Sequence, residues 1–297
     1  MKIAITTPTG NIGGALTKLL LDAGGHELTL LARDTAKVAA HAARGAKVAQ
    51  ADVLNREAVI KATAGAEAVF LLSPPKFDAE DFRAYQNQVG DNFAAAIRAN
   101  KPKRVVFLSS FGAQHKEGTG PITGLHDIEQ KLNAACKEVG AAVLHLRPGY
   151  FLENWFMNVP TIKQAGAVYA PISPDVKWPM IATSDIARVA FEVITGPAWQ
   201  GVQVRELLGA ADVSLGEGVK KLSELTGKPI QFVQVPGDAA KQAMMGMGLG
   251  ASIAGKYVEM YQAAEKGLLE PESKRDGRQY VTFEQFAKAA LAPAIKN

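Results

Sequence analysis

The stretch KIAITTPTGNIGG, residues 2–14, decides the fold of this 297-residue chain. It begins with a short apolar run, passes through a turn that contains glycine, and continues with apolar residues at helical spacing. This order predicts a strand, a tight turn and a helix whose first backbone N–H groups point to one place. Unpaired N–H donors and the positive end of the helix dipole favour an anion there, and the pyrophosphate of a dinucleotide is such an anion.

Two glycines at helical-turn spacing, Gly10 and Gly13, suit this turn to a phosphate ligand. Gly10 lets the backbone approach a phosphate, and Gly13 lets the helix pack closely on the strand. Thr7 stands where a first glycine is expected, so its side chain either crowds a pyrophosphate or donates a hydroxyl hydrogen bond to it. The cofactor-binding residues predicted in this turn are Thr7, Thr9, Gly10, Asn11, Ile12 and Gly13.

The end of the second predicted strand, residues 27–32, indicates which dinucleotide is bound. Such a strand ends near the ribose, where an acidic side chain favours NAD and an arginine pairs with the extra phosphate of NADP. Arg33 comes first here, with Lys37 as a candidate second cation, and we therefore favour NADP(H). Asp34 follows directly and keeps NAD(H) open. The alternative for Arg33 is a solvated charge at a strand end.

Apolar runs and helical patterns alternate along the first half of the chain. Strands are predicted at 2–6, 27–32, 46–50, 66–72, 104–109 and 142–146, and helices at 12–23, 35–43, 55–64, 79–99 and 125–138. The strands are continuously apolar, which indicates a parallel sheet covered on both faces. The predicted fold class is α/β, a doubly wound Rossmann-like parallel sheet with its crevice at the carboxyl ends of the strands. The crevice adds five predicted cofactor-binding residues: Asp52, Ser73, Pro74, Ser109 and Pro148.

The regular alternation stops near residue 150 and predicts two parts. Residues 1–150 form an NAD(P)-binding domain, and residues 151–297 form a smaller, mixed α+β substrate-side subdomain that is partly laced back into the main sheet. In the second part we expect a helix at 184–195 that Thr183 or Ser184 caps. Strands at 202–208 and 229–235 and two helices rich in Ala, Met and Leu follow.

Composition and charge fit a soluble enzyme. The chain is 47% hydrophobic, and its net charge of +4 comes from basic residues scattered among acidic ones, so we expect no nucleic-acid partner. No segment resembles a secretion signal or is long and apolar enough for a bilayer, which predicts no membrane partner and a cytoplasmic location. The single cysteine, Cys136, excludes an internal disulfide, and five scattered histidines predict no metal site.

Several segments in order resemble the NmrA-like group of atypical short-chain dehydrogenase/reductases. They are TPTGNIG (7–13), LARD (31–34), FLSS (107–110), LRPGYFLEN (146–154), DIA (185–187) and TFEQF (282–286). The resemblance covers nearly the whole chain and implies a Rossmann-like NAD(P)-binding fold. It does not imply one reaction, because a fold does not fix a function.

The chain departs from the standard relatives at the residues that relay the proton. Those relatives pair a serine with Tyr-x-x-x-Lys, whereas here His126 stands at the tyrosine position and Gln130 at the lysine position. The resemblance is to members with a His-x-x-Glu spacing, in which His126 and Glu129 share a helical face.

Three residues are the catalytic candidates. His126 is a proton donor or an orienting group, because histidine titrates near neutral pH. Ser110 and Tyr150 would be polar contacts. The alternative for His126 is a capping or orienting histidine bonded to Glu129 or to backbone. His145, inside an apolar strand, is expected to be a core histidine.

The sequence predicts an NADPH-dependent reductase that transfers hydride to an electron-poor aromatic acceptor, such as a quinone or an azo dye. Proximity supplies most of the acceleration in such a reaction. The residues that would line a pocket for a small aromatic or quinone-like substrate, or else fill the core, are Tyr150, Phe151, Trp155, Phe156 and the MMGM segment at 244–247.

Two other functions stay open. A non-catalytic redox sensor would bind NAD(P)(H) and act through a protein partner, and the missing tyrosine and lysine suit it equally well. A sugar-nucleotide epimerase is disfavoured, because such relatives keep the tyrosine. The sequence leaves a homodimer open as the assembly.

Overall fold

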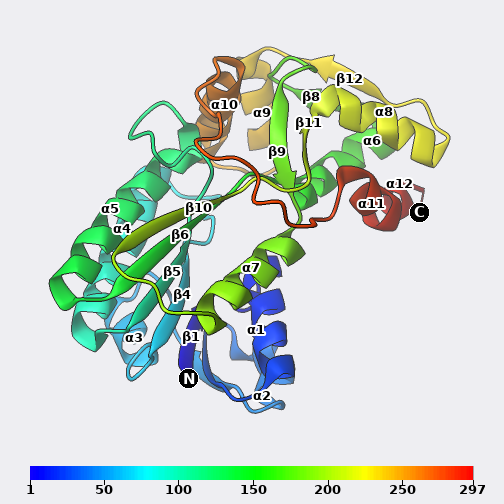
Figure 1. Ribbon diagram of the computed structural model, residues 1–297. Helices are drawn as coiled ribbons and strands as arrows, with labels where there is room; N and C mark the ends of the chain where they lie inside the picture. The colour runs from blue at the N-terminus through cyan, green and yellow to red at the C-terminus, as the bar shows by residue number, and fades with distance from the viewer. Residues whose placement is uncertain (297) are drawn as a thin grey trace.

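A seven-stranded parallel sheet forms the centre of the molecule in the computed structural model, which describes residues 1–296 (Figure 1). The strand order is β10-β6-β5-β4-β1-β2-β3. The chain steps from β1 outward to β3, then crosses to β4 and continues to the other edge, so the order reverses between β1 and β4. The predicted doubly wound fold is confirmed. The strands are β1 (Lys2–Thr6), β2 (Glu27–Ala32), β3 (Lys47–Gln50), β4 (Ala68–Leu72), β5 (Arg104–Leu108), β6 (Ala142–Pro148) and β10 (Val202–Leu207).

Helices cover both faces of this sheet (Figure 1). One face carries α3 (Arg56–Ala62), α4 (Phe82–Asn100) and α5 (Thr123–Val139), and the other carries α1 (Asn11–Ala23), α2 (Ala39–Ala42) and α7 (Thr183–Thr195). Neighbouring residues of one strand therefore enter different cores: Phe70 packs with α1 and α7, whereas Val69 packs with α4 and α5. Two covered faces explain why the strands are continuously apolar. Among residues 1–296, no helix has the length and apolarity that a membrane-spanning segment needs.

The chain after residue 150 contributes to both parts of the molecule. Strand β10 pairs with β6 at the edge of the main sheet, and α7 packs against α1. Strands β7 (Tyr150–Phe151), β9 (Lys177–Ile181) and β11 (Ala211–Ser214) form a three-stranded sheet, and β8 (Ala167–Ala170) pairs with β12 (Gln231–Gln234). The other elements are η3 (Leu152–Asn158), α6 (Val159–Ala165), α8 (Leu215–Thr226), α9 (Gly237–Gly246), α10 (Ala251–Glu265), α11 (Phe283–Phe286), η4 (Ala287–Leu291) and α12 (Ala292–Lys296).

The structure corrects the predicted cap of α7. The helix begins at Thr183, its N-cap is Ala182, and neither Thr183 nor Ser184 caps it. The carboxylate of Glu153, in η3, accepts hydrogen bonds from the Thr183 N–H at 3.0 and 3.1 Å and from its hydroxyl at 2.5 Å. An acidic group from another segment thus satisfies the helix N-terminus, which sequence spacing cannot reveal.

The predicted helix at 35–43 is also different in the structure. It is a 3₁₀ turn, η1 (Thr35–Val38), followed by the single α-helical turn α2. Asp34 caps η1, because its Oδ1 accepts a hydrogen bond from the N–H of Ala36 at 3.0 Å.

Candidate active site

One cavity of about 700 Å³ lies at the carboxyl ends of the central strands and extends to α10. Its lining contains twelve of the fifteen site residues predicted from the sequence: Thr7, Thr9, Gly10, Asn11, Ile12, Arg33, Ser73, Pro74, Ser109, Ser110, Pro148 and Tyr150. Three predicted residues do not line it: Gly13, Asp52 and His126. The parallel sheet brings segments from residue 7 to residue 150 to one edge, as the topology requires.

The turn before α1 leaves the N-terminus of that helix open toward the cavity. Gly10 is the N-cap, no side chain caps the first turn, and no acidic residue lies in it. A Cβ on Gly13 would lie 2.3 Å from the carbonyl oxygen of Thr7, so only glycine fits there. Gly13 therefore permits a close approach of the helix to the turn itself, and it shapes the site without lining it. These features suit an anionic ligand.

Thr7 occupies the first glycine position under strain. Its φ is +53°, in the left-handed region that a β-branched residue rarely adopts. Its hydroxyl is buried and has no hydrogen-bond partner among residues 1–296. A strained residue with an orphaned donor at a ligand turn indicates a functional constraint.

The end of β2 presents one cation to the cavity. Arg33 is exposed, lines the cavity and forms no ion pair with any carboxylate of residues 1–296. The Asp34 carboxylate caps η1. Lys37 does not line the cavity, and the Oδ1 of Asp52 accepts a hydrogen bond from the Leu54 N–H at 2.9 Å within its own loop. No carboxylate among residues 1–296 thus forms an ion pair with the Arg33 guanidinium.

Two more serine hydroxyls lack partners where the strands end. The Oγ atoms of Ser73 and Ser109, after β4 and β5, are buried without a hydrogen bond within the described chain. The hydroxyl of Ser110 donates to the carbonyl of Phe111 at 3.1 Å. Together with Thr7, three orphaned hydroxyls line one cavity, which fits a polar ligand that supplies their partners.

His126 does not reach the cavity lining. Its Nδ1 lies 2.8 Å from the carbonyl oxygen of Ala113, and because a carbonyl only accepts, Nδ1 carries the proton. The imidazole thereby ties α5 to the loop after β5. The structure thus matches the orienting alternative for His126, with backbone as its partner.

Glu129 is committed to a buried ion pair rather than to His126. Its carboxylate accepts two hydrogen bonds from Arg147, at 3.0 and 2.7 Å, and both side chains are almost fully buried. Glu272 approaches the same guanidinium at 3.4 Å. This pair joins α5 to the end of β6, directly before Pro148, and so fixes the strand end that borders the cavity.

The far end of the cavity is aromatic. Of the two alternatives for these side chains, Tyr150, Phe151 and Met244 follow the first and line the cavity. Trp155 follows the second: it is a core residue, 1% exposed, with its ring centroid 5.0 Å from that of Phe283. Phe156 is exposed. The lining residues that sequence reasoning missed include Gln86, Trp178, Tyr257, Met260, Tyr261 and Leu269. The spacing of Tyr257 and Tyr261, four residues apart on one helix, was the one available signal.

The tyrosines at this end are neutral hydrogen-bond donors. Burial raises the pKa of Tyr257 to about 12. Burial and the neighbouring Tyr261 hydroxyl hold the pKa of Tyr150 well above its usual range, and burial also raises the pKa of Tyr261. A raised pKa delays loss of the phenol proton to higher pH, so all three groups stay protonated at neutral pH.

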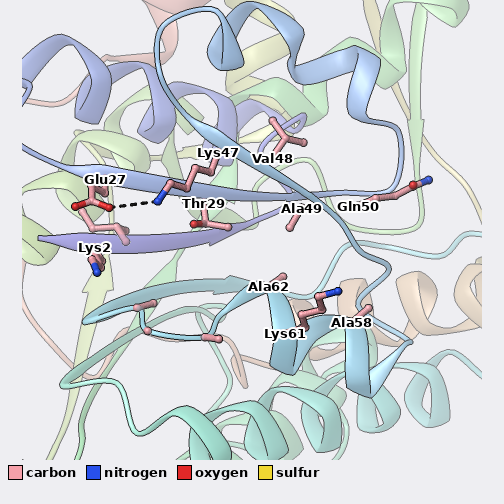
Figure 2. Close-up of a pocket in the computed structure, with 14 residues that line it drawn as sticks. Lys2, Glu27, Thr29, Lys47, Val48, Ala49, Gln50, Ala58, Lys61 and Ala62 are labelled. Atoms are coloured by element: carbon pink, nitrogen blue, oxygen red, sulfur yellow. Dashed lines mark hydrogen bonds and ion pairs between the residues drawn. The ribbon is translucent and has the colours of Figure 1, made fainter.

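A second hollow, of about 650 Å³, lies between the β1–β3 side of the sheet and α3 (Figure 2). Figure 2 shows Lys47 paired with Glu27 above it and Lys61 on the α3 side. No predicted site residue lines this hollow, and its exposed lysines bring no orphaned buried group to it. The cavity at the carboxyl ends is therefore the candidate active site.

Comparison with known proteins agrees with this geometry. The family model described as "NmrA-like family" matches residues 1–287. The chain belongs to the NmrA-like family. It is 30% identical over 295 residues to an NAD(P)H azoreductase of Xenophilus azovorans, with 98% of each chain covered. It is 27% identical over 273 residues to quinone oxidoreductase 2 of Escherichia coli, covering 92% of this chain and 91% of that protein.

Solved structures share the fold of this NmrA-like chain. An NADPH complex of a quinone oxidoreductase from Escherichia coli has a TM-score of 0.82 at 24% identity, and the match covers 97% of this chain and 99% of that one. The Citrobacter triphenylmethane reductase with NADP(H) has a TM-score of 0.80 at 21% identity, with the same coverage of both chains.

Proposed function

We propose that this protein is an NADPH-dependent reductase that transfers hydride to an uncharged, electron-poor aromatic acceptor such as a quinone. One observation carries the proposal: a single cavity joins the phosphate-binding turn and Arg33 to an aromatic compartment. The azoreductase relative, 30% identical over nearly the full length, supports the same class of reaction.

We also propose that the protein acts in the cytoplasm. Its single cysteine, Cys136, is buried and forms no disulfide, which suits a reducing compartment.

The residues present fit NADP(H). The open N-terminus of α1 and the Thr7 hydroxyl would hold the pyrophosphate, and Arg33 would pair with the phosphate on the adenosine ribose. Ser73, Ser109 and Pro148 would bound the rest of the cofactor at the carboxyl ends of the strands. When bound, the reduced nicotinamide supplies a hydride to the acceptor.

The chain's own residues then orient the acceptor and exclude water. Aromatic and methionine side chains, among them Phe151, Trp178 and Met244, enclose the acceptor end. Ser110 and Tyr150 offer hydroxyl contacts there. We assign His126 a positioning role, because its imidazole holds the loop after β5 and stands outside the lining. Proximity and the enclosed site supply the acceleration.

Replacing Thr7 with glycine should stabilise the free protein and weaken NADPH binding. Glycine relieves the positive φ, and the free energy of unfolding should rise by about 1 kcal/mol. The variant also loses the orphaned hydroxyl, so the Kd for NADPH should rise about fivefold to tenfold. Thermal melts and calorimetric titration measure the two effects. Thr7→Ser keeps the hydroxyl and serves as the control, and tighter NADPH binding by Thr7→Gly would show that the side chain crowds the pyrophosphate instead.

The lining predicts a preference for uncharged acceptors. Among the described residues that line the cavity, Arg33 alone is charged, and it belongs to the cofactor end. A sulfonate at the acceptor end would be buried without a counter-ion, at a cost of several kcal/mol. With NADPH, kcat/KM for a naphthoquinone should exceed that for its sulfonated form by about 100-fold or more. Met157→Lys adds a cation at an exposed lining position. This variant should lower the ratio of kcat/KM for the neutral quinone to kcat/KM for the sulfonated one.

The redox sensor remains the second candidate, because a missing Tyr-x-x-x-Lys pair suits it. The continuous aromatic compartment favours the reductase, since a sensor needs no acceptor site. Equal, negligible turnover of the neutral and the sulfonated quinone, together with tight NADPH binding, would favour the sensor.

A further inference from the structure

The acceptor end of the cavity carries phenol groups from two separate segments. Tyr150 comes from β7, and Tyr257 and Tyr261 come from one face of α10. Trp178 packs beside them, with its ring centroid 5.4 Å from that of Tyr150 and 6.0 Å from that of Tyr261. The Trp178 ring is 3% exposed, and its indole N–H has no partner within residues 1–296. This end therefore offers several donors and no carboxylate.

A close backbone contact fixes α10 against the nucleotide-binding part. Gly120, at the start of the short η2 turn (Gly120–Ile122), has a φ of +65°. A Cβ there would lie 2.0 Å from the carbonyl oxygen of Lys256 and 2.9 Å from the N of Met260. Each α10 tyrosine directly follows one of these contact residues in the sequence, so the helix that carries them is held directly against the rim of the site. Donors on a fixed helix are preorganised.

We propose that Tyr257 and Tyr261 are catalytic residues that, together with Tyr150, bind an oxygen of the acceptor and stabilise the negative charge that forms on it. The proposal rests on the reductase function above. It assigns to α10 the contact with the reacting oxygen that the standard tyrosine would make from α5, where this chain has His126.

The step balances without proton loss from the protein. Conversion of a quinone to its hydroquinone takes up two electrons and two protons. The hydride brings both electrons and one hydrogen, and leaves one negative charge on the acceptor oxygen. A proton from water then neutralises that oxygen and leaves hydroxide in solution. The phenols only donate hydrogen bonds, which strengthen as the oxygen becomes charged and so favour the transition state over the ground state.

Single Tyr257→Phe and Tyr261→Phe variants test this proposal. Phenylalanine keeps the ring and removes the hydroxyl. With NADPH and a neutral naphthoquinone, each variant should lose roughly 10- to 100-fold in kcat, while KM for the quinone changes little. The Kd for NADPH and the melting temperature should stay at the wild-type values. Tyr169→Phe is the matched control, because this tyrosine is exposed on β8 and does not line the cavity.

The outcomes separate the two proposals. Wild-type kcat in both α10 variants would overturn the role of the phenols and leave the reductase intact. Losses confined to KM or to the melting temperature would show a structural role and would also overturn it. A wild-type protein that binds NADPH yet reduces no quinone would refute the reductase function, and this inference with it.

Discussion

Arg33→Ala is expected to raise the Kd for NADPH by about 100-fold and to leave the Kd for NADH within about twofold. The guanidinium lines the cavity at the end of β2 and has no ion-pair partner among residues 1–296, so it is available to a phosphate. Only NADPH carries a phosphate on the 2′-oxygen of the adenosine ribose. Calorimetric titration of both cofactors measures the two values.

Lys37→Ala is the control for Arg33. This lysine follows Arg33 by four residues but does not line the cavity. Loss of the Lys37 ammonium should change the Kd for NADPH and the Kd for NADH by less than about threefold, because solvent and salt screen a charge that lies outside the cavity. Equal losses of NADPH and NADH affinity in Arg33→Ala would contradict the phosphate assignment, and would make Arg33 a general support of the turn.

Glu129→Ala is expected to lower the free energy of unfolding by about 3–5 kcal/mol. The variant leaves the buried guanidinium of Arg147 with Glu272, which is more distant at 3.4 Å and 59% exposed. An uncompensated buried charge is far more costly than a lost surface contact. Urea unfolding measures this loss as a shift of the transition midpoint, provided that the slope m of the unfolding free energy against urea concentration stays constant.

The same helix provides the control for Glu129. Glu138, also on α5, receives two hydrogen bonds from Arg98, at 2.5 and 2.8 Å, but this pair is exposed. Glu138→Ala should cost less than about 1 kcal/mol, because solvent screens exposed pairs. If the two variants lost similar amounts of unfolding free energy, burial would not determine how much the Glu129–Arg147 pair contributes to stability.

The fold and the cofactor end of the site were readable from the sequence because their signals are local. Strands β1 and β2 have the predicted bounds, 2–6 and 27–32, since apolar runs and turn residues mark both ends. The topology rule then places Thr7, Arg33 and Ser73 at one edge. The expected core histidine, His145, is 0% exposed, and burial lowers its pKa to about 4.

The acceptor end could not be read in this way because its residues meet only through tertiary packing. Trp178, Tyr257 and Tyr261 lie more than twenty-five residues beyond Tyr150, on elements whose packing has no local pattern. Similarly, the spacing of His126 and Glu129 is compatible with a shared task, but Arg147 from β6 takes up the carboxylate. The strained φ of Thr7 is likewise visible only in the backbone.

The most direct test of the account is anaerobic consumption of NADPH with a neutral naphthoquinone, with the hydroquinone product measured in the same sample. We predict one hydroquinone formed per NADPH oxidised, at a rate well above that without protein and higher with NADPH than with NADH. Tight NADPH binding without hydroquinone formation would contradict it, and would identify the protein as a sensor of the cofactor.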